Sequence, residues 1–450
     1  MTEHINEQNY FEKLLRLTVA NASKIPFYSQ RWPANVEEIV NTPEDLKLLP
    51  IITKQELQTH LRDGFPQAED VVAIHHTYGT TGELFYRYRT QEEGRFFNTF
   101  LQEEKKIKQK KSTSKPGLKP IFLMEGDAYH GTGLPVSPEG LALHVAPDRY
   151  GAEHALDILK KEFNIPGYSA KVNIIKGTAA FILQTTLQLM DEGIEPKSIG
   201  VSSLHTVGGF LSSKTRKFLE TSWGAPLIDY FSLSEILGTA PSCQICKKYR
   251  FKPTVIVEFL DPFSREPVKE GLAALVLTEL FPYISHHPFI RYWSDDLVWV
   301  APGNCPCGDI TFSPKGRLKS AVKDPASPEG KILLTSSEIL EAAEETPEVV
   351  FNEKDEWKWV SQRLGLVIRS SPRISLNLDN TPPKKKNLMM KFECSFSPHF
   401  YFDEAKEAEN KLKMRLLEKS PCLRDAIASK NYQLTVQAVP FIENPTPIYL

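Results

Sequence analysis

The chain lacks the features of secreted, membrane-spanning and nucleic-acid-binding proteins. No apolar run in its 450 residues reaches the length of about 20 that a bilayer requires. The first residues, 1–4, have neither a basic start nor an apolar stretch, so we expect no secretory signal and a cytoplasmic location. A formal net charge of -2 gives no basic excess for nucleic acid. We therefore expect neither nucleic acid nor a membrane among its partners.

Cysteine is scarce, and its placement is informative. In a cytoplasmic protein, the six cysteines are expected to be thiols or metal ligands rather than disulfides. Four of them form two close pairs, Cys243-x-x-Cys246 and Cys305-x-Cys307. Paired thiolates on tight turns hold structural zinc in tetrahedral geometry, and four thiolates leave no open position for catalysis. The alternative is four reduced thiols without a metal.

The length of the chain predicts more than one domain, because 450 residues are too many for one compact core. Helical and strand-like patterns alternate over residues 141–280, which predicts an α/β architecture with a partly parallel sheet. Later β-rich segments predict a second sheet. The pattern changes after residue 316, so we expect a large multi-sheet domain over 1–316 and a smaller, divergent α+β domain over 317–450.

Periodicity also predicts individual elements. Helices are expected at 7–22, at 152–163, in a segment that ends at 190, at 213–222 and from 339 onward. Strands are expected at 172–175, 199–203, 227–231, 254–260, 273–280 and 297–300. Thr53 and Glu56 have the spacing of a capping box, so a further helix should start after Thr53.

A glycine–threonine loop, Tyr78-Gly79-Thr80-Thr81-Gly82, follows a short apolar run that predicts a strand. Glycine lets the backbone approach a ligand closely. Successive backbone N–H groups in such a turn form an anion nest, and the threonine hydroxyls add donors. The simplest ligand is the phosphate chain of a nucleotide, although glycine–threonine turns are common and the loop alone is a weak signal.

Three later segments offer partners for the rest of a nucleotide. Phe231 can stack on a flat base and Glu235 can bind Mg²⁺ that bridges phosphates; the alternatives are a core phenylalanine and a surface glutamate. A carboxylate in the segment 290–297 can accept hydrogen bonds from both ribose hydroxyls, or it lies in a solvated turn. Gly316-Arg317 can clamp an anion, but a dipeptide carries little information.

Taken in order, five blocks over about residues 10–350 resemble the phenylacetate–CoA ligase family of adenylate-forming enzymes. They are Ile25-Pro26-Phe27-Tyr28 with Leu49-Pro50-Ile51-Ile52-Thr53-Lys54, then Tyr78 to Gly82, Phe231 to Glu235, Ile290 to Leu297, and Pro302 to Gly308 with Gly316-Arg317. Tyr78 stands where the family has a serine. The last block is similar to the family's metal turn and hinge.

The resemblance implies roles for individual residues. It makes Thr80, Thr81, Glu235 and Arg317 catalytic, with Glu235 as the magnesium ligand. It implies nucleotide contacts from Gly79, Gly82, Asp229, Tyr230, Phe231, Ser234 and Asp296, with Asp296 rather than Asp295 as the ribose ligand. It implies an acid-binding pocket formed by Tyr129, His130, Gly131, Gly133, Gly208, Gly209 and Phe210. Phe210 stands where the family usually has an acid, and for His130 a packed position elsewhere is an equal alternative.

The implied reaction is the ATP-dependent activation of a carboxylic acid, aromatic or similarly small, to an acyl-adenylate. A thiol, most often that of coenzyme A, then takes the acyl group and AMP leaves. ATP, Mg²⁺ and a structural Zn²⁺ are the implied cofactors, with coenzyme A as co-substrate. In the family the small domain swings about the hinge between the two steps. The resemblance thus implies a biosynthetic acid–thiol ligase.

The C-terminal part departs from the family. The family has a lysine near its C-terminus that contacts the ATP phosphates and the acyl carboxylate, but no lysine follows Lys430 here. The hinge continues as Leu318-Lys319-Ser320 without the usual acidic pair. Three functions stay open: an adenylating enzyme with a displaced lysine, from 384–386 or Lys391; one that transfers the acyl group to a carrier-protein thiol or an amine; and a non-catalytic nucleotide-binding relative.

Overall fold

The computed structural model describes residues 7–60, 65, 69–76, 86–111, 118–126, 140–146, 149–301, 303, 305, 311–324, 330–352, 371–379 and 386–448. Within these ranges no helix is both long and apolar enough to cross a membrane. Several predicted site residues lie outside the described residues, and their roles stay predictions. They are Gly79, Thr80, Thr81, Gly82, Tyr129, His130, Gly131, Gly133 and Cys307.

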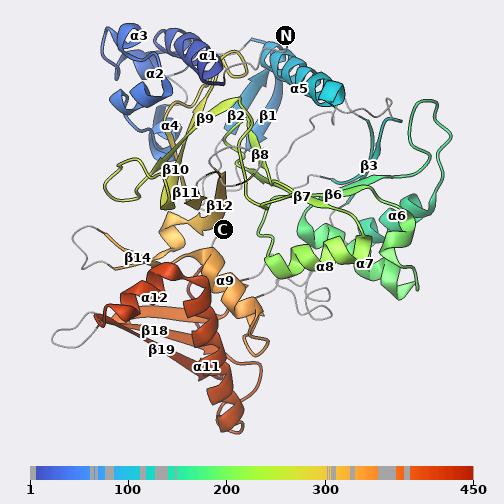
Figure 1. Cartoon of the computed structure of the whole chain (residues 1–450), viewed down its shortest axis with the longest axis vertical. Coiled ribbons are helices and arrows are strands. Elements are labelled where there is room, and N and C mark those ends of the chain that lie inside the picture. Colours follow the sequence, from blue (N-terminus) through green and yellow to red (C-terminus); the bar gives the residue numbers. More distant parts are fainter. Residues whose placement is uncertain are drawn as a thin grey trace.

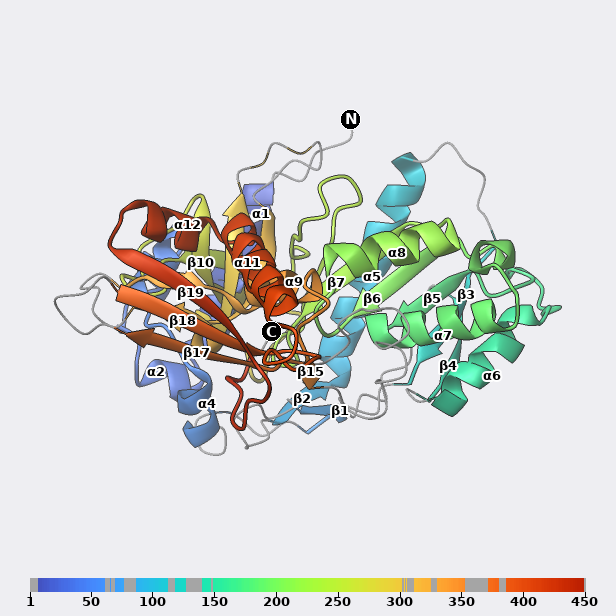
Figure 2. The ribbon, with the colours of Figure 1, turned by 90° about the horizontal axis from the view of Figure 1, so that it is seen from below.

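The alternating half of the chain forms a six-stranded sheet in the order β4-β3-β5-β6-β7-β8. Its elements are β3 (Ile121–Glu125), β4 (Leu141–Val145), α6 (Arg149–Lys160), β5 (Ile174–Gly177), α7 (Ala179–Asp191), β6 (Ser203–Val207), α8 (Ser213–Trp223), β7 (Leu227–Ser232) and β8 (Thr239–Pro241). All neighbours pair in parallel except β7 and β8. Helices α6, α7 and α8 cover one face and bury Ile175, Leu204 and Leu227 (Figures 1 and 2). The predicted partly parallel sheet is confirmed.

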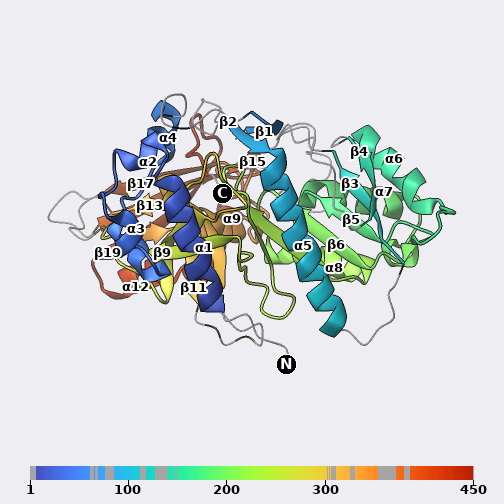
Figure 3. The same ribbon diagram turned by 90° about the horizontal axis from the view of Figure 1, so that it is seen from above.

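A second, antiparallel sheet in the order β12-β11-β10-β9 carries the N-terminal helices. Its strands are β9 (Val255–Leu260), β10 (Gly271–Glu279), β11 (Tyr292–Ala301) and β12 (Thr311–Arg317). The helices are α1 (Glu7–Ala22), α2 (Pro26–Ser29), α3 (Val36–Ile39) and α4 (Lys54–His60), with a 3-10 turn, η1 (Pro43–Leu48). A hairpin of β1 (Val71–His76) and β2 (Tyr86–Thr90) leads into α5 (Gln91–Lys111), which runs between the two halves (Figure 3).

The C-terminal residues build a third core around a sheet in the order β17-β18-β19 (Figures 1 and 2). The elements are η3 (Leu318–Ser320), β13 (Val322–Lys323), β14 (Ile332–Leu334), α9 (Ser336–Glu344), β15 (Phe351–Asn352), β16 (Ser371–Pro372), β17 (Ile374–Asp379), β18 (Lys386–Glu393), α11 (Phe402–Lys419), α12 (Pro421–Ala428) and β19 (Tyr432–Val439). A multi-sheet α/β fold with a smaller α+β part is therefore confirmed. The boundary between residues 316 and 317 stays a prediction; Arg317 is the last residue of β12.

Most predicted elements are found within a few residues of their expected limits, and the capping box is confirmed. The Thr53 amide donates to Glu56 Oε2 at 2.8 Å, and the Glu56 amide donates to Thr53 Oγ1 at 3.3 Å. The strand predicted at 199–203 is wrong. A 3-10 helix, η2 (Pro196–Ile199), occupies its start and ends at Gly200, whose φ of 79° is left-handed, so β6 begins only at Ser203. The helix predicted from 339 starts at Ser336 instead, behind its cap Thr335.

Candidate functional site

Glu235 lies in the turn between β7 and β8, beyond the carboxyl end of the parallel strand β7. The residue is 5% exposed, and its Oε1 is 3.2 Å from Lys54 Nζ at the start of α4. The guanidinium of Arg87 on β2 donates to the Glu235 carbonyl oxygen and fixes the turn from the other side. Mg²⁺ is commonly held by one or two carboxylates together with substrate phosphates, so the Glu235 carboxylate is a suitable ligand for the predicted ion.

Asp295 and Asp296 have different partners because β11 has a bulge over residues 294–296. Leu297 pairs with Ala274 and Trp293 with Val276, so residues 294–296 lie opposite one residue of β10. Asp295 has a φ of 66°, and its Oδ1 accepts a hydrogen bond from the Trp293 indole at 2.9 Å. A bulge of this kind re-aims a side chain. Here it leaves Asp296 opposite Arg317, which supports the choice of Asp296 over Asp295.

The Asp296 carboxylate is buried and incompletely hydrogen-bonded. The residue is 5% exposed, and Oδ1 is 3.2 Å from Arg317 Nε. Among the described residues, no group hydrogen-bonds to its Oδ2. Burial raises the pKa of Asp296 to about 6, against the opposing effect of the Arg317 charge. Buried acceptors normally have partners, so this unpaired oxygen is consistent with the predicted role of Asp296 as an acceptor for ribose hydroxyls.

The first sequence block is fastened to the start of β11. The Ile52 amide donates to the Arg291 carbonyl at 3.0 Å, and the Trp293 amide donates to the Ile52 carbonyl at 2.9 Å. Arg291 holds Glu258 in a two-pronged ion pair of 3.1 and 2.9 Å and donates to the Leu49 carbonyl at 2.6 Å. These contacts fix the chain two residues before Lys54. They bring the first and fourth blocks of the sequence together beside Glu235.

Asp229 is held by protein groups. The residue is 7% exposed, and its carboxylate accepts hydrogen bonds from Thr206 Oγ1 at 2.6 Å and from the Tyr249 hydroxyl. Burial raises the pKa of Asp229. These partners favour a role in joining β6 to β7 over direct contact with a nucleotide, which stays a prediction.

The other nucleotide candidates of this segment are half-buried. The Phe231 ring is edge-to-face with Tyr249, Phe251 and Phe312, at centroid distances of 6.5, 6.0 and 5.5 Å. The phenylalanine is thus at the margin of the core, which keeps both its predicted stacking role and the packing alternative open. The ring centroids of Tyr230 and His205 are 5.6 Å apart, and Ser234 lies directly before Glu235.

The two glycines after β6 are exposed and have a left-handed backbone. The next residue, Phe210, contacts the C-terminal part. Gly208 and Gly209 have φ values of 71° and 96°, and a Cβ atom at either position would meet open space. A ligand can therefore approach this backbone closely. The Phe210 ring packs against the C-terminal core. Its predicted contact with the acid stays a prediction.

Three of the four predicted metal ligands are brought together. The Sγ atoms of Cys243, Cys246 and Cys305 lie within 4.8 Å of one another, and Cys243 Sγ is 3.8 Å from Cys305 Sγ. The Ile245 amide donates to Cys243 Sγ at 3.4 Å, and Lys247, with a φ of 58°, closes the turn. Amide-supported thiols on a tight turn fit a tetrahedral zinc site, with Cys307 as the fourth predicted ligand.

Comparison with known proteins places this geometry in context. No protein-family model matches the chain. A phenylacetate–coenzyme A ligase of Thermus thermophilus is 23% identical over 316 residues, covering 66% of this chain and 66%, just under two thirds, of that protein. The open conformation of a 2-hydroxyisobutyryl-CoA ligase, solved with 2-HIB-AMP and CoA, has a TM-score of 0.65 at 15% identity and covers 97% of this chain and 89% of its own. The chain has the adenylate-forming fold.

This sequence similarity confirms the expected resemblance to phenylacetate–CoA ligases, while the matches of the individual blocks stay predictions. Two further solved structures are similar in fold. ATP-bound MatB of Rhodopseudomonas palustris has a TM-score of 0.52 at 13% identity, covering 85% of this chain and 67% of its own. An acyl acid amido synthetase in complex with 2,4-DB has a TM-score of 0.57 at 12% identity, covering 96% and 86%. These low identities show the fold alone.

Three charged residues near the candidate site were not predicted from the sequence as site residues. Lys54 entered the sequence analysis only as the last residue of the first block. Its place in that block was the only sequence feature that pointed to the site. Lys319 lies two residues after Arg317 of the predicted hinge, and burial and then the Arg317 charge lower its pKa. Arg87 gave no sequence signal, because its contact with the Glu235 carbonyl joins residues far apart in the chain.

Proposed function

We propose that the chain joins a carboxylic acid to a thiol in two steps. The acid's carboxylate oxygen attacks the α-phosphorus of ATP, the bond from that phosphorus to the bridging oxygen breaks, and pyrophosphate leaves with the oxygen. The thiol, that of coenzyme A, then displaces AMP from the acyl-adenylate as its proton is lost. The sequence similarity to a phenylacetate–coenzyme A ligase and the fold shared with a CoA ligase support this reaction.

The observation that carries the proposal is the buried Asp296–Arg317 pair beside Glu235, in which one carboxylate oxygen has no hydrogen-bond partner among the described residues. Ribose hydroxyls would donate to Asp296, and Arg317, which is paired with Asp296, would contact the adenylate. Glu235 would hold Mg²⁺, which neutralises phosphate charge when bound. The loop residues Thr80 and Thr81 would donate to the phosphates as their charge redistributes.

We assign the remaining residues of the nucleotide and acid sites from the resemblance of the sequence to phenylacetate–CoA ligases. Gly79, Gly82, Asp229, Tyr230, Phe231 and Ser234 would complete the nucleotide site, and Tyr129, His130, Gly131, Gly133, Gly208, Gly209 and Phe210 the acid site. The exposed, left-handed pair Gly208-Gly209 supports this assignment, since its backbone is open to a ligand. An aromatic or similarly small acid is the proposed substrate.

A second acceptor class has its own support. The fold is shared with an acyl acid amido synthetase. Transfer to an amine or to a carrier-protein thiol is therefore the alternative, with a non-catalytic nucleotide-binding relative as the third. We further propose a structural zinc on the four cysteines, a mobile part beginning at residue 317, and a cytoplasmic location.

The test is pyrophosphate exchange into ATP with a panel of carboxylic acids, with and without magnesium. Exchange with at least one acid is expected, and product analysis with coenzyme A, a carrier protein and amines then identifies the acceptor. Glu235→Ala should lower metal-dependent exchange by at least about 100-fold, the usual effect of one lost charge-stabilising group. Exchange at the wild-type rate in this variant would refute the role of Glu235, and no exchange with any acid would refute the enzyme.

A further inference from the structure

A buried ion pair lies behind the turn that carries Glu235. Arg87 on β2 and Glu279 at the end of β10 are each 1% exposed, and Arg87 Nη1 is 2.9 Å from Glu279 Oε2. The guanidinium lies over the Phe289 ring, with 3.8 Å between its central carbon and the ring centroid. A buried ion pair often adds no net stability over apolar side chains of similar volume. The value of this pair therefore lies in what it holds in place.

The pair holds the main chain of the turn at two points. Arg87 donates to the Glu235 carbonyl oxygen. Glu279 Oε1 accepts a hydrogen bond from the Leu237 amide at 2.8 Å. Both contacts are made to backbone groups, so they fix the direction of the Glu235 side chain without occupying its carboxylate.

The turn is also packed closely against β9. Val255 on β9 pairs with Glu279 on β10. A Cβ atom at Gly238 would lie only 2.7 Å from Val255 Cγ2, which is closer than side-chain atoms pack. The turn therefore has no room to move toward β9, and the ion pair anchors it in this position.

The same pair connects the turn with two other segments. Arg87 lies five residues after Gly82, the last residue of the predicted phosphate loop. It also donates to the His287 carbonyl oxygen, and Glu279 accepts a hydrogen bond from the Phe289 amide at 3.1 Å. The pair thus joins β2 and residues 287–289 to the turn.

We propose that Arg87 and Glu279 are positioning residues: together they hold the Glu235 carboxylate where it can bind the Mg²⁺ of the triphosphate. This inference rests on the proposed function. Each residue acts on the backbone of the turn and reaches the metal only through Glu235. Groups that orient a metal ligand are worth about 10–100-fold in metal affinity or activity.

The test separates this anchoring from stability. Arg87→Met combined with Glu279→Leu replaces the pair by apolar side chains of similar size, which usually preserves stability. Glu279→Gln keeps an acceptor for the Leu237 amide and keeps the Arg87 contact with Glu235, but it leaves a buried guanidinium without its carboxylate. Three quantities are measured: amide hydrogen exchange over residues 233–238 by mass spectrometry, the Mg²⁺ concentration for half-maximal pyrophosphate exchange, and the melting temperature.

The C-terminal part contains a matched control pair. Arg373 Nε is 2.6 Å from Glu393 Oε2, and their side chains are 16% and 14% exposed. Arg373 donates to the Ile442 carbonyl oxygen, and Glu393 accepts a hydrogen bond from the Ile442 amide at 2.9 Å. This pair therefore also anchors a main-chain segment through one carbonyl and one amide.

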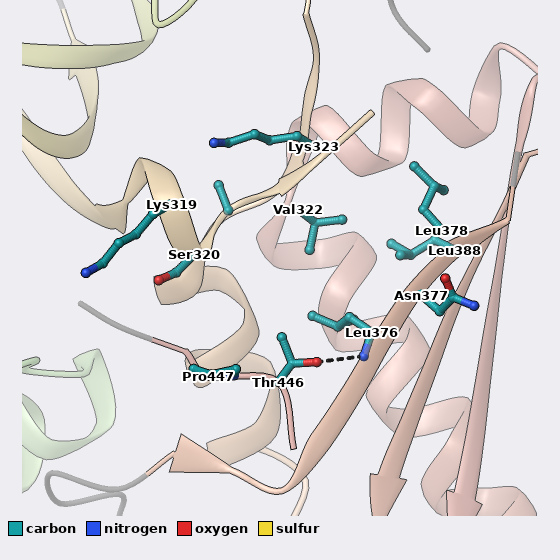
Figure 4. Close-up of a pocket in the computed structure, with 11 residues that line it drawn as sticks. Lys319, Ser320, Val322, Lys323, Leu376, Asn377, Leu378, Leu388, Thr446 and Pro447 are labelled. Atoms are coloured by element: carbon teal, nitrogen blue, oxygen red, sulfur yellow. Dashed lines mark hydrogen bonds between the residues drawn. The ribbon is translucent and has the colours of Figure 1, made fainter. Parts of the chain in front are cut away.

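The control pair belongs to a different part of the fold. Arg373 directly precedes β17, and Figure 4 shows Leu376 and Leu378 of that strand on the wall of a pocket of about 390 Å³. The described residues that line this pocket lie within 319–447. Arg373→Met combined with Glu393→Leu should leave both the Mg²⁺ dependence and the hydrogen exchange of residues 233–238 unchanged.

We expect the double variant at positions 87 and 279 to melt near the wild-type temperature. Its residues 233–238 should exchange amide hydrogen at least about tenfold faster, because the Leu237 amide loses a charged acceptor. It should also need at least about tenfold more Mg²⁺. Glu279→Gln should show the opposite pattern, with a lower melting temperature but a Mg²⁺ dependence and a hydrogen exchange close to those of wild type.

Wild-type Mg²⁺ dependence in the double variant would overturn the inference, since the pair would then be merely structural. An equal shift in Mg²⁺ dependence in Glu279→Gln and the double variant would overturn it too, because the backbone anchors are kept in one and lost in the other. Wild-type protein that exchanges pyrophosphate with no acid would instead reject the proposed function. In that case hydrogen exchange of the ligand-free protein would still judge the anchoring, and an unchanged segment 233–238 in the double variant would refute it.

Discussion

At the scale of single residues, the burial of Asp296 should make the proposed nucleotide binding depend on pH. Its pKa is raised to about 6, chiefly by burial. In the proposed complex the ribose hydroxyls would donate to the ionised carboxylate, so the form that binds should be lost as the pH falls below about 6. The affinity for adenosine should therefore be constant above neutrality and about tenfold weaker one pH unit below the pKa. Calorimetric titration between pH 5 and pH 8 measures this, and adenosine is used because it has no phosphate that titrates there.

Asp296→Asn is the matched control for that titration, because it keeps the shape of the side chain and removes its ionisation. The variant should bind adenosine weakly at all pH values, with a flat profile. If its profile still bent near pH 6, another group would be responsible for the pH dependence.

The sequence alone was sufficient to select Glu235 and Asp296 as candidates, because each lies in a block whose order along the chain matches a family. It was not sufficient to find their partners. Lys54 meets Glu235 across 181 positions, and nothing local to either residue encodes that contact. The choice between Asp295 and Asp296 came from the family resemblance. Its structural cause, the bulge in β11, depends on pairing with β10 and left no local pattern.

At the scale of elements, strong periodicity predicted the positions of helices well. The limits of short strands depended instead on contacts with residues far away in the sequence. Helix α1 was placed at its observed limits because its apolar residues recur along one face. The strand before Gly208 was misplaced, since a short run containing Ile199 and Val201 looks equally suited to a strand or a 3-10 turn. Gly200 decided the outcome by its left-handed φ of 79°.

The pair of Arg291 and Glu258 fixes the first block on β11, so breaking it should destabilise this part of the molecule. Arg291 and Glu258 side chains are 7% and 15% exposed, and the arginine also holds the Leu49 carbonyl. Glu258→Ala leaves a buried guanidinium without its carboxylate, which should lower the free energy of unfolding by about 3 kcal/mol. Urea unfolding followed by tryptophan fluorescence measures the loss. Glu266→Ala, at an exposed position, should change little, and equal values for the two variants would contradict this role.

The cysteine turn predicts a bound metal. The purified chain should contain one zinc ion, and Cys246→Ser should lose it because a tetrahedral thiolate site needs all of its ligands. Mass spectrometry of the metal content and the melting temperature measure both effects. Cys422→Ser is the control, since Cys422 on α12 lies outside the cluster of three thiols. Equal zinc content in both variants would argue against this site.

At the scale of the whole molecule, Phe210 joins the two parts of the chain. It follows Gly208-Gly209 on the N-terminal side, and its ring packs against the core formed by α9, α11 and the β17-β18-β19 sheet. In the related family an acid is usual here, and an acid would not favour this apolar contact. Phe210 thus ties the predicted acid-binding turn to the position of the C-terminal part. Movement of that part is expected to change what surrounds the acid.

Phe210→Ala should therefore shift the arrangement of the two parts. Removing a half-buried ring costs about 1 kcal/mol of contact, which corresponds to roughly a fivefold change in the population of this arrangement. Small-angle X-ray scattering should show a larger radius of gyration, and limited proteolysis should cut faster after residue 317. Phe441→Ala is the control, because that ring is 65% exposed and should leave both measurements unchanged. Superimposable scattering curves for Phe210→Ala and wild type would mean that the ring does not hold the parts together, and the arrangement would then depend on polar contacts such as Lys315 with Glu338, 3.8 Å apart.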